Sequence, residues 1–356
     1  MRDCGEGAVW RMRKQLDKCL SCKIANMGFL CACLVVLIHC PVSQTHSLYI
    51  EHFLKVYLTL IAVPCFFMIS GFLLARHVLE ERWYTDAIKK RIRTLIVPLL
   101  VLDTMWFPIK YAIHYVGVSC FGADGSSEVM RLTLYNVLSG IGIIPWGQAV
   151  VIGMWYIKAL FLLVLISPAF KFLVCQGKGR MIVSVLCVFG CSIIQNALLE
   201  GGVWNYEFNL QWAFYFMIGM AFCKHGGLNE VVRFRYISVV VAVVALFCLE
   251  KNIGQAIRGI TLVCATLAMS IVVWSFVPSR QWSRQLVGNS FPVFVTHGMI
   301  LYLLPIPFKV LGRWNDVVNV LGAIPIWFVV MGIALSLSVM VKRYFPIFSR
   351  VAFGGR

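Results

Sequence analysis

The chain contains one histidine whose position at the end of an apolar run suits proton transfer. His39 closes the run Leu34-Val-Val-Leu-Ile-His39, and Pro41, which lacks a backbone N–H, is expected to end the helix there. An imidazole has a pKa of about 6.5, so at neutral pH it can accept a proton from a hydroxyl group. His39 is therefore a candidate general base. The alternative is an interfacial histidine at a helix end, without a chemical role.

The basic run Lys89-Lys-Arg-Ile-Arg93 is a candidate anion site. An Arg side chain matches phosphate oxygens with two parallel hydrogen bonds, which a lone Lys does not. The apolar stretch before this run contains Ser70-Gly71, a hydroxyl next to a residue without a side chain, where another backbone or a ligand can approach closely. The alternative is that Gly71 packs a helix and the cations only anchor it on the cytoplasmic side.

The elements that must position these residues are membrane helices. Hydrophobic residues make up 60% of the chain, charged residues 13%, and the mean hydropathy is +0.83, which is too apolar for a soluble core. We expect an all-α, polytopic membrane protein with about ten transmembrane helices in one bundle. Counts of nine and eleven helices are the alternatives, because the first, sixth and seventh segments are short for a membrane span. The segments are 24–40, 53–76, 94–116, 149–175, 181–199, 208–223, 236–250, 257–277, 288–308 and 319–341.

The cations of the chain predict its orientation in the membrane. With the N-terminus in the cytoplasm, 24 of the 32 Lys and Arg residues fall in segments on the cytoplasmic side. Both termini are therefore expected inside the cell, and the protein in the inner or plasma membrane. The net charge of +17 then reflects orientation and contact with anionic lipid, not a nucleic-acid partner.

The same pattern divides the chain into three parts. Residues 1–23 form a cytoplasmic basic leader, 24–341 the transmembrane domain and 342–356 a short cytoplasmic tail. The leader is not a signal peptide, because its basic region is long and no cleavage pattern of small residues follows the first apolar run. The connection 117–148 is expected outside, either as a lid over an acceptor or as an irregular loop.

The cysteines do not indicate a metal site. Most of the 14 lie in predicted helices, where a thiol behaves as a small hydrophobe. Cys19-Leu-Ser-Cys22 has the spacing of a metal or redox pair, but no second pair or histidine cluster accompanies it. We expect no metal and no tightly bound cofactor.

Charged residues inside predicted spans are costly and suggest a functional cavity. Asp103 and Lys110 lie two turns apart on one helix face, so they could pair with each other or line that cavity. Trp155 is either part of an aromatic belt or of a platform for an acceptor. The candidates for lining the cavity are Asp103, Trp155, Lys158 and His297.

Four segments, in this order, resemble the acyltransferase 3 family of membrane enzymes. They are Leu34 to His39, Phe66-Phe-Met-Ile-Ser-Gly-Phe-Leu-Leu74 with its basic run, Met154-Trp-Tyr-Ile-Lys-Ala-Leu160, and Gly288-Asn-Ser-Phe-Pro-Val-Phe-Val-Thr-His297. The resemblance implies that His39 activates an acceptor hydroxyl. This chain departs from the family at Gly28, eleven residues before His39, where Arg or Lys is usual. The resemblance to the family also implies that the donor is bound by Ser70, Lys90, Arg91 and Arg93.

The function expected from this resemblance is acyl transfer across the membrane. An acyl group, expected to be acetyl, moves from cytoplasmic acyl-CoA, a substrate and not a resident cofactor, to a hydroxyl of an extracytoplasmic saccharide or glycolipid. The expected partners are membrane lipid, acyl-CoA and the glycan acceptor, without nucleic acid. The alternatives are a succinyl or longer-acyl transferase, an amine acceptor, or a non-enzymatic glycan or lipid transporter.

Overall fold

The computed structural model describes residues 3–41, 57–78, 80–121, 153–175, 177–198, 209–225, 232–250, 255–310 and 313–355. Within these ranges all regular structure is helical, which confirms the all-α prediction. The helices are α1 (Asp3–His39), η2 (Leu58–Ile61), α3 (Ala62–Ala75), α4 (Trp83–Arg91), η3 (Ile92–Ile96), α5 (Val97–Phe121), α7 (Met154–Leu165), α8 (Ser167–Cys175), α9 (Lys178–Leu198), α10 (Leu210–His225), η6 (Val232–Phe234), α12 (Arg235–Glu250), α13 (Gln255–Phe276), α14 (Arg284–Gly288), α15 (Ser290–Leu303), α16 (Ile306–Val310), α17 (Trp314–Leu321), α18 (Ala323–Tyr344) and α19 (Pro346–Ala352).

Eight helical stretches in the described part of the chain are long and apolar enough to cross a membrane. Helices α7 and α8 make a ninth if they are counted as one span bent by 60°. The bend coincides with Pro168, whose missing N–H and ring interrupt a helix that continues from the preceding turn. The eight are Lys18–His39, Leu58–Ala75, Trp83–Ile113, Lys178–Gln195, Val232–Leu249, Ile257–Phe276, Ser290–Phe308 and Ala323–Tyr344.

Each of the ten apolar segments predicted from the sequence overlaps a helix of the structure. The difference from the predicted count lies in α10, which has only 16 residues, and in the bent pair. A straight span needs about 20 residues. The greater part of the predicted outer connection 117–148 lies outside the described residues.

Helices lie close to both ends of the described part of the chain. Helix α1 continues without a break from Asp3 through the predicted leader to His39. At the other end, α19 packs against α5, with Ala352 and Phe353 buried. Gly354 has a φ of +66°, and a Cβ atom there would lie 2.8 Å from the carbonyl oxygen of Thr94. The tail is therefore closely packed on the start of the α5 span.

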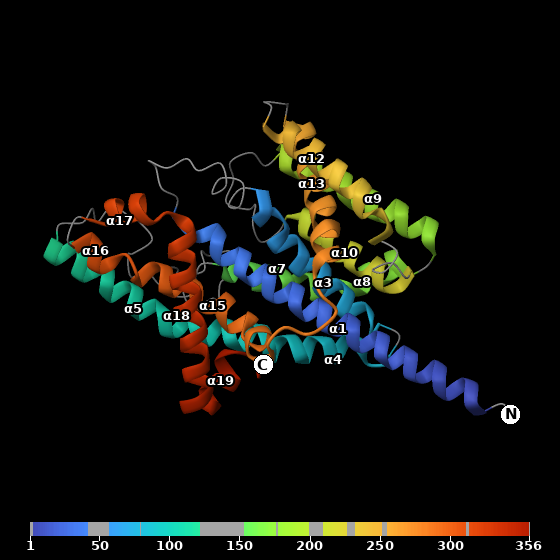
Figure 1. The fold of residues 1–356 in the computed structure, drawn as a ribbon, viewed down its shortest axis with the longest axis horizontal. Coiled ribbons are helices and arrows are strands. Elements are labelled where there is room, and N and C mark those ends of the chain that lie inside the picture. The colour runs from blue at the N-terminus through green and yellow to red at the C-terminus, as the bar shows by residue number, and fades with distance from the viewer. Residues whose placement is uncertain are drawn as a thin grey trace.

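Helix α1 lies between two groups of helices (Figure 1). It packs against α3 on one side and against α15 and α18 on the other. Figure 1 shows α5, α16, α17 and α18 to one side of α1 in this view, and α9, α12 and α13 to the other. Residues on α1 can therefore meet residues of both groups.

Helices α3 and α10 approach each other at the level of their backbones. A methyl group on Gly71 would overlap the carbonyl oxygen of Phe216, and one on Gly219 would overlap that of Met68. Reciprocal glycines of this kind allow close helix packing in a membrane, where dispersion contacts replace the hydrophobic effect. Of the two neighbours predicted near Gly71, a backbone or a ligand, the structure has a backbone there, which agrees with the helix-packing alternative.

Candidate active site

A cavity of about 1220 Å³ lies between α1, α3, α4, α7 and α15. Its lining contains one group of charged side chains and one group of aromatic side chains, called here the charged end and the aromatic end. Arg91, of the charged group, lies close enough to Tyr156 to interact with it electrostatically. The charged end carries Arg76, His77, Glu80, Asp86, Lys90 and Arg91, and the aromatic end carries Phe66, Tyr156 and Phe294. The lining between them comes from Ser21, Ile24, Ala25, Gly28, Ile69, Ser70, Leu73, Leu74, Trp83, Ala87, Leu95, Leu160, Val287, Gly288, Ser290 and Phe291.

Three of the four predicted donor residues line this cavity and the fourth does not. Ser70, Lys90 and Arg91 are in the lining, whereas Arg93 is exposed elsewhere. Residues two positions apart on a helix point about 200° apart, so Arg91 and Arg93 face opposite ways. The wider turn of the π-helix η3, which begins at Ile92, does not bring them together. Sequence reasoning did not single out Arg76, a further cation of the charged end.

The aromatic end is built around Tyr156. Its hydroxyl lies 3.5 Å from Ser70 Oγ, and its ring centroid lies 5.6 Å from that of Phe66 and 5.6 Å from that of Phe294. Phe66 and Phe294 are 5.9 Å apart, so the three rings are in mutual contact. Tyr156 is not among the residues that the sequence predicts to line the cavity, whereas its neighbour Trp155 is.

Two histidines, His39 and His297, stack on each other next to Phe294 of the aromatic end. The rings of His39 on α1 and His297 on α15 are stacked, with centroids 5.4 Å apart and planes 29° apart. The ring of Phe294, which lines the cavity, lies 5.9 Å from that of His297, and neither histidine is part of the lining. A Cβ atom on Gly153, which has a φ of +90°, would lie 3.5 Å from His297 Cε1. The backbone ahead of α7 thus covers the pair from another side.

The tautomer of His297 follows from its hydrogen bond. Nδ1 lies 2.5 Å from the carbonyl oxygen of Phe294, and because a carbonyl only accepts, Nδ1 must carry the proton. Nε2 of the neutral ring then keeps an electron pair that can accept a hydrogen bond. His297 is fully buried, and Nε2 has no hydrogen-bond partner among the described residues.

The other predicted cavity residues lie away from this cavity. Asp103 is fully buried on α5, and Lys158 is 9% exposed on α7. Trp155 packs on Trp212, with ring centroids 5.5 Å apart. None of these three lines the cavity. The Lys110 ammonium lies 5.7 Å from the ring centroid of Tyr302. The part of the chain that the structure describes contains no group of three or more His, Cys, Asp or Glu residues that could hold a metal ion.

The profile of the acyltransferase 3 family, described as an acyltransferase domain, matches residues 27–343. The chain belongs to this family. The match includes His39, the charged and aromatic ends of the cavity, and His297, so the resemblance expected from four segments is confirmed. The apolar helices of the chain make it a multi-pass membrane protein.

One curated relative of this chain is the succinoglycan biosynthesis protein ExoH of Rhizobium meliloti (strain 1021). It is 27% identical over 180 residues. That alignment covers 48% of each protein, so the chain spans about half the length of this relative. No solved structure matches the chain.

Proposed function

We propose that this acyltransferase moves an acyl group, acetyl in the simplest case, from acyl-CoA to a hydroxyl of an extracytoplasmic saccharide or glycolipid. The supporting observation is the combination of residues at one cavity. Cations and three aromatic rings line it, and one of these rings, Phe294, contacts the stacked pair of His39 and His297. Small-molecule sites usually have volumes of about 300–1,000 Å³. A cavity of about 1220 Å³ has room for a long ligand such as acyl-CoA.

The charged end is proposed to hold the phosphates of the donor. Lys90, Arg91 and Arg76 all line this cavity, and Arg–phosphate hydrogen bonds are among the stronger ones because both partners are charged. Glu80, also in the lining, is engaged by His77 at 2.6 Å, which reduces its repulsion of a phosphate. Ser70 lies further along, toward the aromatic end, where its hydroxyl can contact the pantetheine arm.

The histidine pair is proposed to perform the proton transfers. His39 takes the proton of the acceptor hydroxyl as its oxygen attacks the thioester carbonyl. The new C–O bond forms, the C–S bond breaks, and the CoA thiolate receives the proton from His39, so atoms and charges balance. A general base in this role contributes about 10²–10⁴ in rate. His297 Nε2 accepts a second hydrogen bond from the acceptor and orients it.

The proposed path needs no movement of the whole donor across the membrane. The phosphates stay at the charged end, and the arm extends past Ser70 to the aromatic end. Phe294 lines the cavity and contacts His297, whereas neither histidine is in the lining, so in this proposal the Phe294 ring turns aside for the thioester to reach His39. The acceptor reaches the pair from the opposite side.

The same geometry would serve a succinyl or longer acyl group or an amine acceptor. The relative's name links it to succinoglycan, which favours a saccharide as the acceptor of this chain as well. A glycan or lipid transporter without catalysis would not require two stacked histidines at the end of a cation-lined cavity.

Purified protein in detergent, incubated with radiolabelled acetyl-CoA and a mixture of oligosaccharides, tests the proposal. We expect released CoA and label on a saccharide, with succinyl-CoA compared in parallel. His39→Ala should stop transfer and leave CoA binding within about twofold, because the imidazole lies beyond the aromatic end from the charged end. His225→Ala is the matched control, since His225 lies on α10 and contacts the carbonyl oxygen of Val174. Normal transfer by His39→Ala would reject the mechanism.

A further inference from the structure

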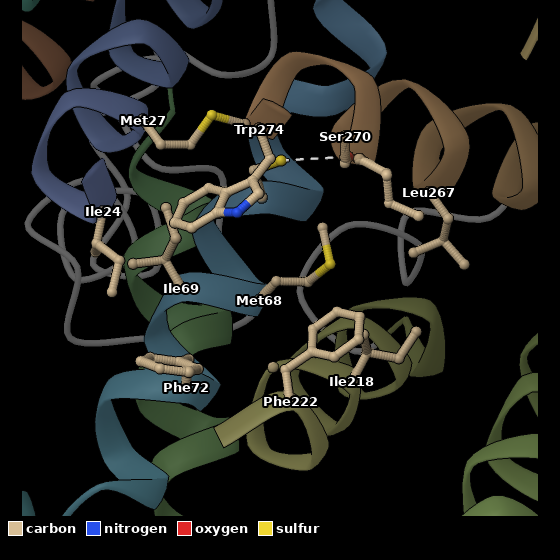
Figure 2. Close-up of a pocket in the computed structure, with 13 residues that line it drawn as sticks. Ile24, Met27, Met68, Ile69, Phe72, Ile218, Phe222, Leu267, Ser270 and Trp274 are labelled. Carbon is tan, nitrogen blue, oxygen red and sulfur yellow. Dashed lines mark hydrogen bonds between the residues drawn. The ribbon is translucent and has the colours of Figure 1, made fainter. Parts of the chain in front are cut away.

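A second, smaller cavity of about 150 Å³ lies between α1, α3, α10 and α13 (Figure 2). Its lining is apolar apart from two side chains, Ser270 and Trp274. Ser270 needs no ligand, because its hydroxyl donates to the Thr266 carbonyl at 2.6 Å and accepts from Cys65 Sγ at 3.3 Å. The apolar lining consists of Ile24, Met27, Cys65, Met68, Ile69, Phe72, Ile218, Gly219, Phe222, Leu267 and Ile271.

Trp274 brings an unsatisfied donor to this cavity. Its side chain is 7% exposed, and its indole Nε1–H has no hydrogen-bond partner among the described residues. Figure 2 shows the indole ring among the lining side chains, with its nitrogen on the edge nearest Met68. An indole N–H is only a donor, and leaving it unpaired in an apolar surrounding costs free energy. The cavity therefore suits a ligand with hydrocarbon and an acceptor oxygen.

Cations lie at the same end of the bundle as Trp274. The Lys23 ammonium is 4.9 Å from the centroid of the Trp274 ring. Arg280 is exposed in the loop after α13, and this loop is fastened to α1 by Asn26, whose side chain donates to the carbonyl oxygens of Pro278 and Arg280 at 3.0 and 2.9 Å. A ligand that binds in the cavity next to the Trp274 ring would therefore lie near the positive charges of Lys23 and Arg280.

We propose that this cavity binds one acyl chain of an anionic membrane phospholipid. An ester carbonyl accepts the hydrogen bond of Trp274 Nε1, and the phosphate lies toward Lys23 and Arg280. An apolar cavity of 150 Å³ is known to hold a six-carbon ring, so this one takes a segment of hydrocarbon of about that size. The half-buried Ile218 and Ile271 belong to α10 and α13, and the rest of the chain leaves between these helices into the bilayer.

The position of the cavity along α1 argues for a membrane lipid over the acyl group of the donor. Met27 in its lining precedes His39 by twelve residues, which is about 18 Å along a helix. The transferred acyl group must reach His39, whereas the glycerol esters of a phospholipid lie near the membrane interface, where Trp and Lys are also found. Ile24 and Ile69 line both cavities, so a bound chain would brace the wall of the larger one.

Native mass spectrometry of the full-length protein from phosphatidylglycerol nanodiscs tests this site. We expect one retained lipid, at least threefold more than from phosphatidylcholine nanodiscs. Trp274→Phe keeps the ring and removes the donor, and should reduce retention by about 3- to 10-fold, the effect of one lost hydrogen bond. Trp282→Phe is the matched control, because Trp282 packs on Phe29 outside the cavity lining.

Two further measurements test the lipid site without depending on the folding of Trp274→Phe. Lys23→Gln should remove the preference for the anionic lipid. A phosphatidylglycerol with a diazirine on its acyl chain should crosslink to peptides containing Met27, Met68 or Phe222 in the unmodified protein. Crosslinks confined to other surfaces would overturn the proposal, as would retention that folded Trp274→Phe and Lys23→Gln proteins leave unchanged. Displacement of the retained lipid by long-chain acyl-CoA would assign the cavity to the donor instead.

Discussion

Replacing Arg91 and Arg93 one at a time gives the most direct test of the donor site. The two residues carry the same charge and lie at the same end of the membrane span. Arg91 lines the cavity and is half-buried, whereas Arg93 is exposed outside it. Arg91→Ala removes at least one charge-assisted hydrogen bond to a phosphate, which is worth about 1.5–3 kcal/mol. The dissociation constant for CoA should therefore rise by about 10- to 150-fold.

Arg93→Ala should change the CoA dissociation constant by less than about twofold, because surface charges outside a site contribute little to binding. Isothermal titration calorimetry of the purified variants with CoA measures both values. Elution volume and thermal unfolding in detergent confirm that each variant is folded. Equal losses of affinity for the two variants, or a larger loss for Arg93→Ala, would show that the cavity does not hold the donor phosphates.

Three further predictions address the histidine pair, the packing and the topology. His297→Phe keeps an aromatic ring but removes the Nε2 acceptor, so the transfer rate should fall about tenfold with CoA affinity unchanged; a normal rate would reject its role. Gly71→Ala should lower stability by about 1–3 kcal/mol, since the clash is with backbone, and Gly190→Ala, which faces open space, is the thermal-unfolding control. In a background without reactive cysteines, an impermeant thiol reagent should label a cysteine at Asn209 in intact cells and one at Lys178 only after permeabilisation; the reverse order would refute the charge-based topology.

The sequence was sufficient to place the helices, because a membrane span requires an apolar run of a set length. At Gly71 it predicted a close approach but not whether a backbone or a ligand makes it; the structure has the Phe216 backbone there. It could not give the length of α10, because hydropathy changes gradually at helix ends, or the bend between α7 and α8, which depends on how Pro168 is accommodated.

The sequence predicts individual residues of the candidate site, but not how the helices bring them together. His39 and His297 were each singled out, yet nothing in either local sequence says that α1 and α15 pack together and stack the two rings. Helical periodicity could have separated Arg91 from Arg93, because alternate residues face opposite sides. Trp274 carried no signal, because a tryptophan near a helix end is equally compatible with the lipid interface and with a buried cavity.

Gly28, where the family usually has a cation, lines the large cavity and faces open space. Eleven residues correspond to three helical turns, so Gly28 and His39 lie on the same face of α1 but about 16 Å apart. An arginine at this position could not reach the imidazole of His39. The cation usual in the family would therefore act on the donor, and its absence here should weaken donor binding without changing the basicity of His39.

Gly28→Arg should accordingly lower the CoA dissociation constant by about 3- to 10-fold, the effect of one added charged hydrogen bond in a partly hydrated cavity. Gly28→Ala should change neither affinity nor stability, because a methyl group there meets no other atom within 4 Å. The pH profile of transfer should be the same for both variants and the unmodified protein. A shifted pH profile in Gly28→Arg, with unchanged CoA affinity, would mean that charge at this position acts on His39 through the length of the cavity, and that the donor phosphates lie elsewhere.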